Sequence, residues 1–221
     1  MKKKILMIVA VVTMMPSVVS ASPLVDYSHG KVAVDLTWRN SDVAMSHSFI
    51  PNLDKRYNMD WGFTAGLGNN LAIQYRQFNP RSKDYSVSGA SINLQLETQE
   101  VNVLYKFDKN VIAYAGIMET KGVINQNISG GNHVGISTNK ASKWQVGLIG
   151  TAKLAEKTTA YASIGTGKDL TTWEIGIGQE IGPNLEFNVD YRLVKAKKFE
   201  IVNETIDLTA KGLGCGVTYK F

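Results

Sequence analysis

GLGCGVTYKF, the stretch from Gly212 to Phe221, alternates strictly between two kinds of side chain. The apolar residues on its odd positions are Leu213, Cys215, Val217, Tyr219 and Phe221. Glycine, threonine and lysine occupy the even positions between them. A two-residue period predicts a β-strand with one apolar and one polar face. The strand ends on phenylalanine although chain ends usually fray into solvent, so this terminal aromatic side chain needs an explanation.

The same alternation recurs along most of the chain. Nine further segments show it, at 31–39, 57–67, 71–76, 101–107, 112–118, 143–148, 158–167, 173–178 and 185–193. The segment at 158–167 shows it least clearly. No comparable stretch with helical periodicity follows the first residues. The pattern therefore predicts an all-β protein with ten strands, and eight strands is the alternative if the weak segment is not a strand.

The connectors between these segments are of two kinds. Four are short, at 68–70, 108–110, 155–157 and 182–184, and three of them contain the Gly, Asn, Asp or Pro residues of tight turns. Longer polar connectors lie between them, at 40–56, 79–95, 121–141 and 195–206, and a fifth at 167–170 is short. Because short and long connectors alternate, we expect antiparallel strands with the tight turns at one end and the loops at the other.

The first residues have the features of a secretory signal peptide. Three lysines at positions 2–4 precede an apolar run from Ile5 to Met15, and small residues lead up to Ala21. The run is too short for a membrane-spanning helix. We expect cleavage after Ala21, giving a signal peptide at 1–21 and one domain at 22–221. Loss of the three lysines lowers the net charge from +5 to +2.

An alternating last strand that ends in phenylalanine resembles the C-terminal signature of bacterial outer-membrane β-barrels. Tyr219 and Phe221 carry the resemblance, and it implies that the outer-membrane insertion machinery reads this strand. Aromatic residues recur on the apolar faces near strand ends, as at a membrane interface, at Trp38, Tyr57, Tyr75, Tyr105, Trp144, Trp173, Tyr191 and Tyr219. The fold expected is a transmembrane antiparallel up-and-down β-barrel in the outer membrane of a Gram-negative envelope, with outer-membrane lipid around it.

If the apolar faces meet lipid, the polar faces line the lumen. The charged candidates for the lumen are Lys31, Asp35, Arg39, Asp60, Arg76, Glu100, Lys106, Lys143, Lys153, Glu174, Glu180, Glu186, Asp190, Arg192 and Lys220. A ten-stranded barrel is narrow, and buried charges of opposite sign pair. The pattern predicts a porin-like or structural barrel with a narrow charge-lined lumen, either closed by ion pairs or open to small solutes.

Two other roles fit the sequence less directly. The alternative is an adhesin or surface-recognition barrel that binds surface ligands through its long loops. Enzymatic activity is not expected, because the three histidines, His29, His47 and His133, lie at no spacing that fixes a nucleophile beside a base. The sequence has no motif for a cofactor or metal. It also lacks a basic patch with interleaved aromatic residues, so nucleic acid is not an expected partner.

Overall fold

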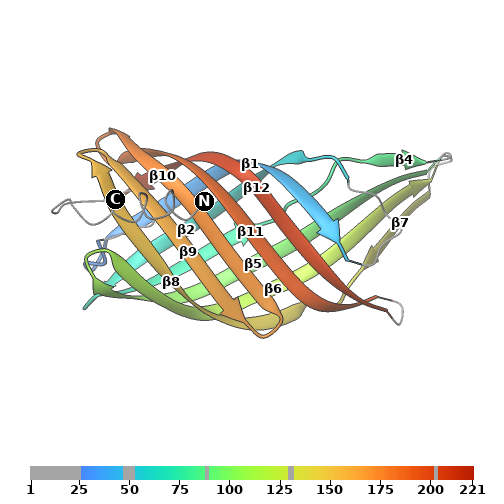
Figure 1. Ribbon diagram of the computed structural model, residues 1–221, viewed down its shortest axis with the longest axis horizontal. Helices are drawn as coiled ribbons and strands as arrows, with labels where there is room; N and C mark the ends of the chain where they lie inside the picture. The colour runs from blue at the N-terminus through green and yellow to red at the C-terminus, as the bar shows by residue number, and fades with distance from the viewer. Residues whose placement is uncertain (1–25, 47–52, 88–89, 129–131, 202–203) are drawn as a thin grey trace, which may run out of the picture.

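The computed structural model describes residues 26–46, 53–87, 90–128, 132–201 and 204–221. Within these ranges every regular element is a β-strand (Figure 1). The strands are β1 (Val32–Met45), β2 (Arg56–Gly68), β3 (Leu71–Phe78), β4 (Tyr85–Val87), β5 (Ala90–Asp108), β6 (Val111–Ile128), β7 (Asn132–Ser137), β8 (Ala141–Ala155), β9 (Thr158–Gly167), β10 (Leu170–Gly182), β11 (Leu185–Ile201) and β12 (Glu204–Lys220). The described residues include no helix long and apolar enough to cross a membrane.

Ten of the strands close into an antiparallel barrel, as predicted. Around the wall they follow the order β1, β2, β3, β5, β6, β8, β9, β10, β11, β12, and β12 pairs with β1 to close the ring. The weakly alternating segment at 158–167 is β9. Closure pairs Leu208–Lys220 of the last strand with Ala33–Met45 of the first, and the Phe221 amide donates a 2.8 Å hydrogen bond to the Val32 carbonyl.

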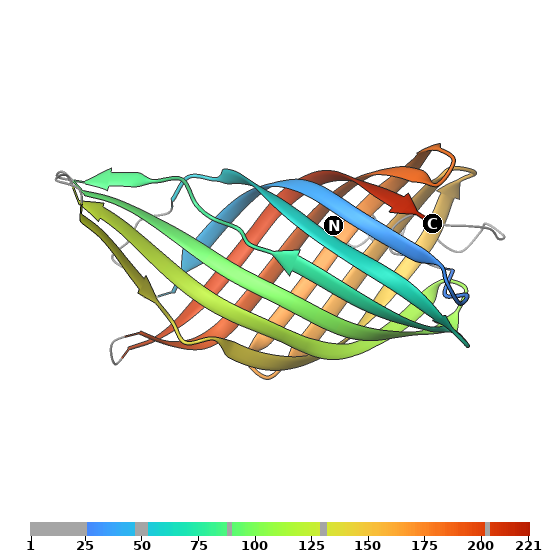
Figure 2. The same cartoon turned by 180° about the vertical axis from the view of Figure 1, so that it is seen from behind.

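The two extra strands lengthen one side of the barrel. β4 pairs with the first residues of β5, and β7 pairs with the last residues of β6. Together β4, β5, β6 and β7 form a four-stranded sheet that projects past the other strands, on the right of Figure 1 and on the left of Figure 2. The barrel wall is therefore much taller on this side.

The two ends of the barrel differ in their connections. Tight turns at 69–70, 109–110, 156–157 and 183–184 lie at the end where β12 finishes, which we call the turn end. Asn69 and Asn70 both have positive φ, 52° and 62°, as a two-residue type I′ hairpin turn requires. The opposite end, the hairpin end, carries the other five connections.

The prediction of long polar loops at the hairpin end is wrong for much of those segments. β1 continues to Met45, β6 continues to Ile128 and β5 already begins at Ala90. The strands of the barrel wall are accordingly 8 to 19 residues long. Polar outward side chains give these segments the composition of loops, but polar and apolar residues still alternate along them as in a strand.

The two faces of the wall exchange polarity partway up the barrel. In β11 the outward side chains are apolar from Leu185 to Leu193, and then become lysines at Lys195 and Lys197. The inward side chains change in the opposite sense, from the buried Arg192 to the buried Val194. β12 shows the same exchange between its apolar inward residues near Leu208 and its apolar outward residues near Leu213. The outside thus carries an apolar band near the turn end and a polar surface above it.

Candidate functional site

The interior of the barrel is filled in three layers. A charged layer lies in the middle and is built from side chains that point inward from most strands. A large apolar layer, the hairpin-end layer, lies above it, and a smaller apolar layer, the turn-end layer, lies below it. This arrangement follows from the sequence because many strands have polar inward positions in their middle and apolar inward positions nearer one end, as in β5, where Glu100 and Asn102 lie between Leu96 and Leu104.

Arg39 on β1 is the centre of one half of the charged layer. Its side chain is 2% exposed, and its Nε lies 2.7 Å from Oδ2 of Asp60 on the neighbouring strand. Its Nη1 contacts Asp190 of β11 and donates to the Gly212 carbonyl at 3.1 Å. One guanidinium therefore serves two buried carboxylates and a backbone carbonyl. Such burial is tolerated because both charges and donors are satisfied.

Arg76 and Arg192 organise the other half of the charged layer. Arg76 Nη2 lies 2.7 Å from Glu174 Oε2, and Arg192 pairs with Glu100. Arg192 Nε is also 3.8 Å from the same Glu174 oxygen, so Glu174 links the two arginines. Tyr161 donates to the other Glu174 oxygen at 3.3 Å. These ion pairs join β3, β5, β10 and β11 across the lumen.

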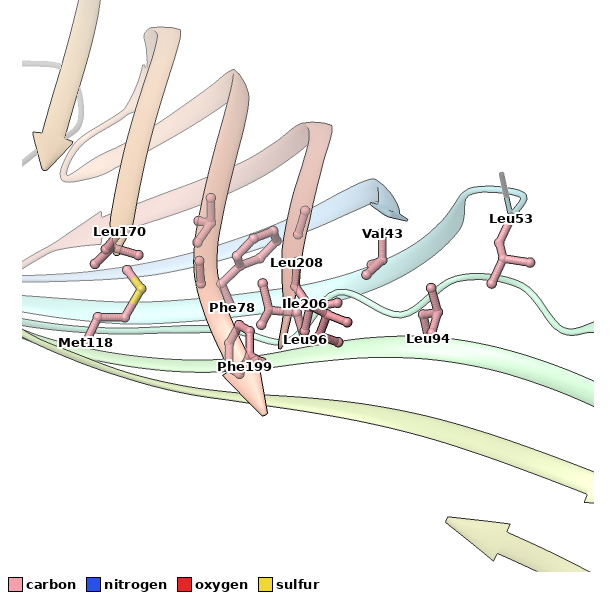
Figure 3. Close-up of a cluster of buried hydrophobic side chains, with 13 residues drawn as sticks. Val43, Leu53, Phe78, Leu94, Leu96, Met118, Leu170, Phe199, Ile206 and Leu208 are labelled. Carbon is pink, nitrogen blue, oxygen red and sulfur yellow. The ribbon is translucent and has the colours of Figure 1, made fainter. Parts of the chain in front are cut away.

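The hairpin-end layer covers the charged layer with packed apolar side chains (Figure 3). Phe78 is 0% exposed and marks the boundary, since its ring centroid lies 5.6 Å from the Arg39 guanidinium and 5.0 Å from that of Arg192. Leu208 of β12 reaches the opposite wall, where a Cβ on Gly122 of β6 would lie 2.5 Å from its Cδ1. The members are Val43, Leu53, Phe78, Leu94, Leu96, Met118, Leu170, Val194, Ala196, Phe199, Ile206, Leu208 and Ala210.

The turn-end layer closes the lower mouth of the barrel. Tyr27, from the segment before β1, is 3% exposed and belongs to the same buried cluster as Leu104, Ile112 and Ile149 of the wall. The layer also contains Ala33, Ala72 and Tyr114. Tyr27 and Tyr114 are therefore the two largest side chains at this mouth, and Tyr27 comes from the N-terminal segment.

A small cavity remains within the charged layer. Its volume is about 70 Å³, and Asp35, Arg76, Glu174 and Asn188 are among the residues that line it. A cavity needs only about 10–15 Å³ measured in this way to hold one water, so this space is large enough for several waters. The Oδ1 atom of Asn188 has no partner among the described residues and is a suitable acceptor for such a water.

The remaining predicted lumen residues lie nearer the ends. Glu186 is 1% exposed and accepts a 2.7 Å hydrogen bond from Lys220, and Asp35 accepts one from Thr218 at 2.5 Å. Lys143 is buried at the hairpin end and donates to the Lys197 carbonyl at 2.9 Å. Lys106, Lys153 and Glu180 are half-buried, whereas Lys31 is exposed at the turn-end rim, just before β1.

Sequence reasoning overlooked the neutral members of the interior. Gln145 donates to Glu100 at 3.1 Å and to Asn102 at 2.8 Å, which completes the polar network beside Arg192. Gln145 stands between Trp144 and Val146, so its inward position follows from the alternation. The apolar layers were also detectable, because Leu94, Leu96 and the residues around Leu208 alternate in the opposite phase to the rest of their strands.

Outside the barrel, aromatic residues border the apolar band. Trp173 and Tyr191 stack with centroids 5.3 Å apart toward the hairpin end, and Tyr219 and Phe221 meet edge to face at 4.7 Å at the turn end. Above the band the surface is charged. In the β9–β10 turn, a hydrogen bond from Lys198 lowers the pKa of the Asp169 carboxyl, and their atoms lie 2.9 Å apart.

A closed antiparallel barrel with an apolar outer band, aromatic borders and a polar interior layer is an outer-membrane β-barrel protein. Residues 10–221 match the family model of the outer membrane protein beta-barrel domain, and the chain belongs to this family. It is therefore a protein of the outer membrane, in the envelope of Gram-negative bacteria, as predicted. In such barrels the short turns face the periplasm and the longer connections face outward, so the hairpin end is extracellular.

Solved barrels resemble the chain in fold at low sequence identity. The outer membrane protease OmpT from Escherichia coli aligns over 92% of this chain and 99% of its own, with 10% identity and a TM-score of 0.56. Ail, the attachment invasion locus protein of Yersinia pestis, aligns over 87% and 99%, with 14% identity and a TM-score of 0.48. Neisserial surface protein A aligns over 87% and 100%, with 14% identity and a TM-score of 0.44. No curated protein matches the sequence.

The histidines do not form a site within the described residues. His29 is exposed at the turn end, and His133 lies on β7 opposite Asn127. His47 lies outside the described residues. In the described part of the chain, no three His, Cys, Asp or Glu side chains are grouped so that they could hold a metal ion.

Proposed function

We propose that this chain is a structural outer-membrane barrel with a closed lumen rather than a porin-like channel. The observation that carries the proposal is the layering of the interior. A solute would have to pass the hairpin-end layer, where Phe78, Leu96 and Leu208 are at most 2% exposed. It would then have to separate the ion pairs of Arg39 and Arg192. Neither step is compatible with a water-filled path of useful width.

Single-channel recording tests the closed lumen. We expect purified protein in a planar lipid bilayer to give no discrete conductance steps, while a general porin in the same bilayer conducts. Protein insertion is checked separately, by the faster migration of the unheated barrel on a gel. Reproducible steps from inserted protein would contradict the proposal and favour the porin-like alternative.

The projecting sheet favours surface recognition as a second role for the same barrel. β4 and β7 are its outermost strands, and within the described residues each pairs with a single neighbour, so the sheet has edges at the hairpin end. Tyr85 and Ile136 are 42% and 40% exposed there. Unpaired strand edges and exposed apolar side chains above a membrane are features that protein partners use. This role needs no catalysis and no opening of the lumen.

A shortened hairpin tests this second role. Thr120 of β6 pairs with Ala141 of β8, so residues 121–140 can be replaced by an Asn-Gly turn at a register that leaves the pairing below intact. We expect bacteria that display the full chain to adhere to extracellular-matrix proteins or epithelial cells, and the shortened, correctly folded barrel to lose adhesion. Equal adhesion by both chains would exclude the β6–β7 projection as the binding surface.

We also propose that the insertion machinery recognises the last strand. Phe221 is 63% exposed and Tyr219 is 43% exposed, on the outer side of the seam between β12 and β1. Both aromatic side chains are thus available before lipid surrounds them. Small solutes are not proposed as ligands, since the cavity in the charged layer is of water size.

A further inference from the structure

The segment before β1 is folded against the inside of the barrel. Residues 26–31, which we call the N-terminal latch, turn back on themselves through a 3.2 Å hydrogen bond from the Lys31 amide to the Ser28 carbonyl. Two further bonds attach the latch to the end of β2. The Gly68 amide donates to the Tyr27 carbonyl at 2.8 Å, and the Gly66 amide donates to the Lys31 carbonyl at 2.7 Å.

Close approach to β2 depends on a glycine. A Cβ on Gly66 would lie 2.4 Å from the Ser28 carbonyl oxygen and 2.8 Å from the Tyr27 carbonyl carbon. Both neighbours are backbone atoms, so a side chain at position 66 would displace the latch rather than push aside a flexible group. The absence of a side chain at Gly66 therefore lets the latch lie directly on the inner wall.

The latch places Tyr27 between opposite walls of the barrel. Tyr27 belongs to one buried cluster with Ala33 of β1, Leu104 of β5, Ile112 of β6 and Ile149 of β8. Around the ring, β6 and β8 lie four and five strands away from β1. These walls face each other only after the sheet has curled into the barrel. The binding place of Tyr27 is therefore absent from an open, partly formed sheet.

We infer that the N-terminal latch docks after the barrel has curled and that its docking slows the opening of the finished barrel. A contact that forms after the transition state for folding stabilises the native state mainly by reducing the unfolding rate. The contribution comes from the aromatic ring rather than from the hydroxyl, because the Tyr27 Oη atom has no hydrogen-bond partner among the described residues.

Folding and unfolding rates of purified protein in detergent micelles test the inference, followed by tryptophan fluorescence and by gel migration. We expect Tyr27→Ala to unfold at least about tenfold faster and to fold within about twofold of the wild-type rate, since truncation of a buried aromatic side chain is costly. Gly66→Ala should behave in the same way, because its Cβ would displace the backbone of the latch at Tyr27 and Ser28 while the Tyr27 side chain itself stays unchanged. The matched control Tyr27→Phe keeps the ring and should unfold no faster than the wild type.

Two kinetic results would overturn the inference. One is a Tyr27→Ala barrel that unfolds at the wild-type rate. The other is a Tyr27→Ala or Gly66→Ala barrel whose folding rate falls by the same factor as its unfolding rate rises.

Discussion

Removal of the Arg39 guanidinium is the sharpest test of the charged layer. Arg39→Met keeps much of the side-chain volume but removes the partner of both Asp60 and Asp190. Asp60 and Asp190 are 6% and 4% exposed, so neither carboxylate can recover its hydration by turning to water. The Oδ1 atom of Asp60 already lacks a partner among the described residues, so this carboxylate depends on Arg39 more heavily.

The expected loss of stability is large because the remaining charges are buried. Breaking a buried ion pair by removing one partner costs about 3–5 kcal/mol, most of it the penalty of the unpaired charge. Adding Asp60→Asn and Asp190→Asn to Arg39→Met removes both unpaired charges. We therefore expect the triple variant to recover most of the loss, to within about 2 kcal/mol of the wild type.

Urea unfolding of the barrel in lipid vesicles measures these free energies, with gel migration as the second probe. Lys211→Met is the surface control, because Lys211 lies 3.8 Å from Asp42 with a side chain 45% exposed and such pairs contribute up to about 1 kcal/mol. The reasoning is refuted if Arg39→Met is no more destabilising than Lys211→Met. It is also refuted if the triple variant is less stable than Arg39→Met alone.

Three further predictions concern the other parts of the barrel. Leu208→Ala should lower the free energy of unfolding in urea by about 2–5 kcal/mol, because Leu208 is 2% exposed in the interior. Leu213→Ala should lower it much less, because Leu213 is 58% exposed on the lipid face. Equal losses would contradict the exchange of polarity between the two positions. Lys198→Ala should raise the lowered pKa of Asp169 toward its ordinary value in an NMR titration. The Lys198–Asp169 pair stabilises the fold fully above the ordinary pKa of the carboxyl, and this stabilisation is lost as the pH falls through the lowered pKa of the folded protein. An unchanged titration would contradict the contact. Phe221→Ala should reduce the fraction of chain recovered folded in outer membranes, whereas normal recovery would exclude a role in insertion.

Local sequence pattern was sufficient for the architecture of the lower barrel. The alternation in Gly212–Phe221 identified the outward face correctly, and Asn69 and Asn70 marked a tight turn that the structure contains. These features are local, because a strand's period and a turn's φ angles depend on neighbouring residues. Lipid on one side of the wall makes the pattern unusually regular, since every outward residue in the band must be apolar.

The strands of the upper barrel were not predicted, because apolar side chains there point inward and polar side chains point outward, the reverse of the lower barrel. Above Leu193 the surroundings of the wall change from lipid to water, so polar residues such as Lys195 turn outward and apolar residues such as Val194 turn inward. A polar outward face beyond a strand looked like a loop. The signal in the sequence was the change of phase, with Leu208 and Ala210 on even positions and Leu213 on an odd one.

What the sequence determined by itself was therefore the ten alternating segments of the lower barrel, the tight turns between them and the outward face of those segments. What only the tertiary structure decided was which inward residues meet. Arg39 and Asp190 are 151 positions apart, and they contact each other because β12 pairs with β1 on one side and with β11 on the other, so that β11 is the second strand from β1. Ring closure sets such neighbours through register and curvature of the whole sheet, and no local period contains that information.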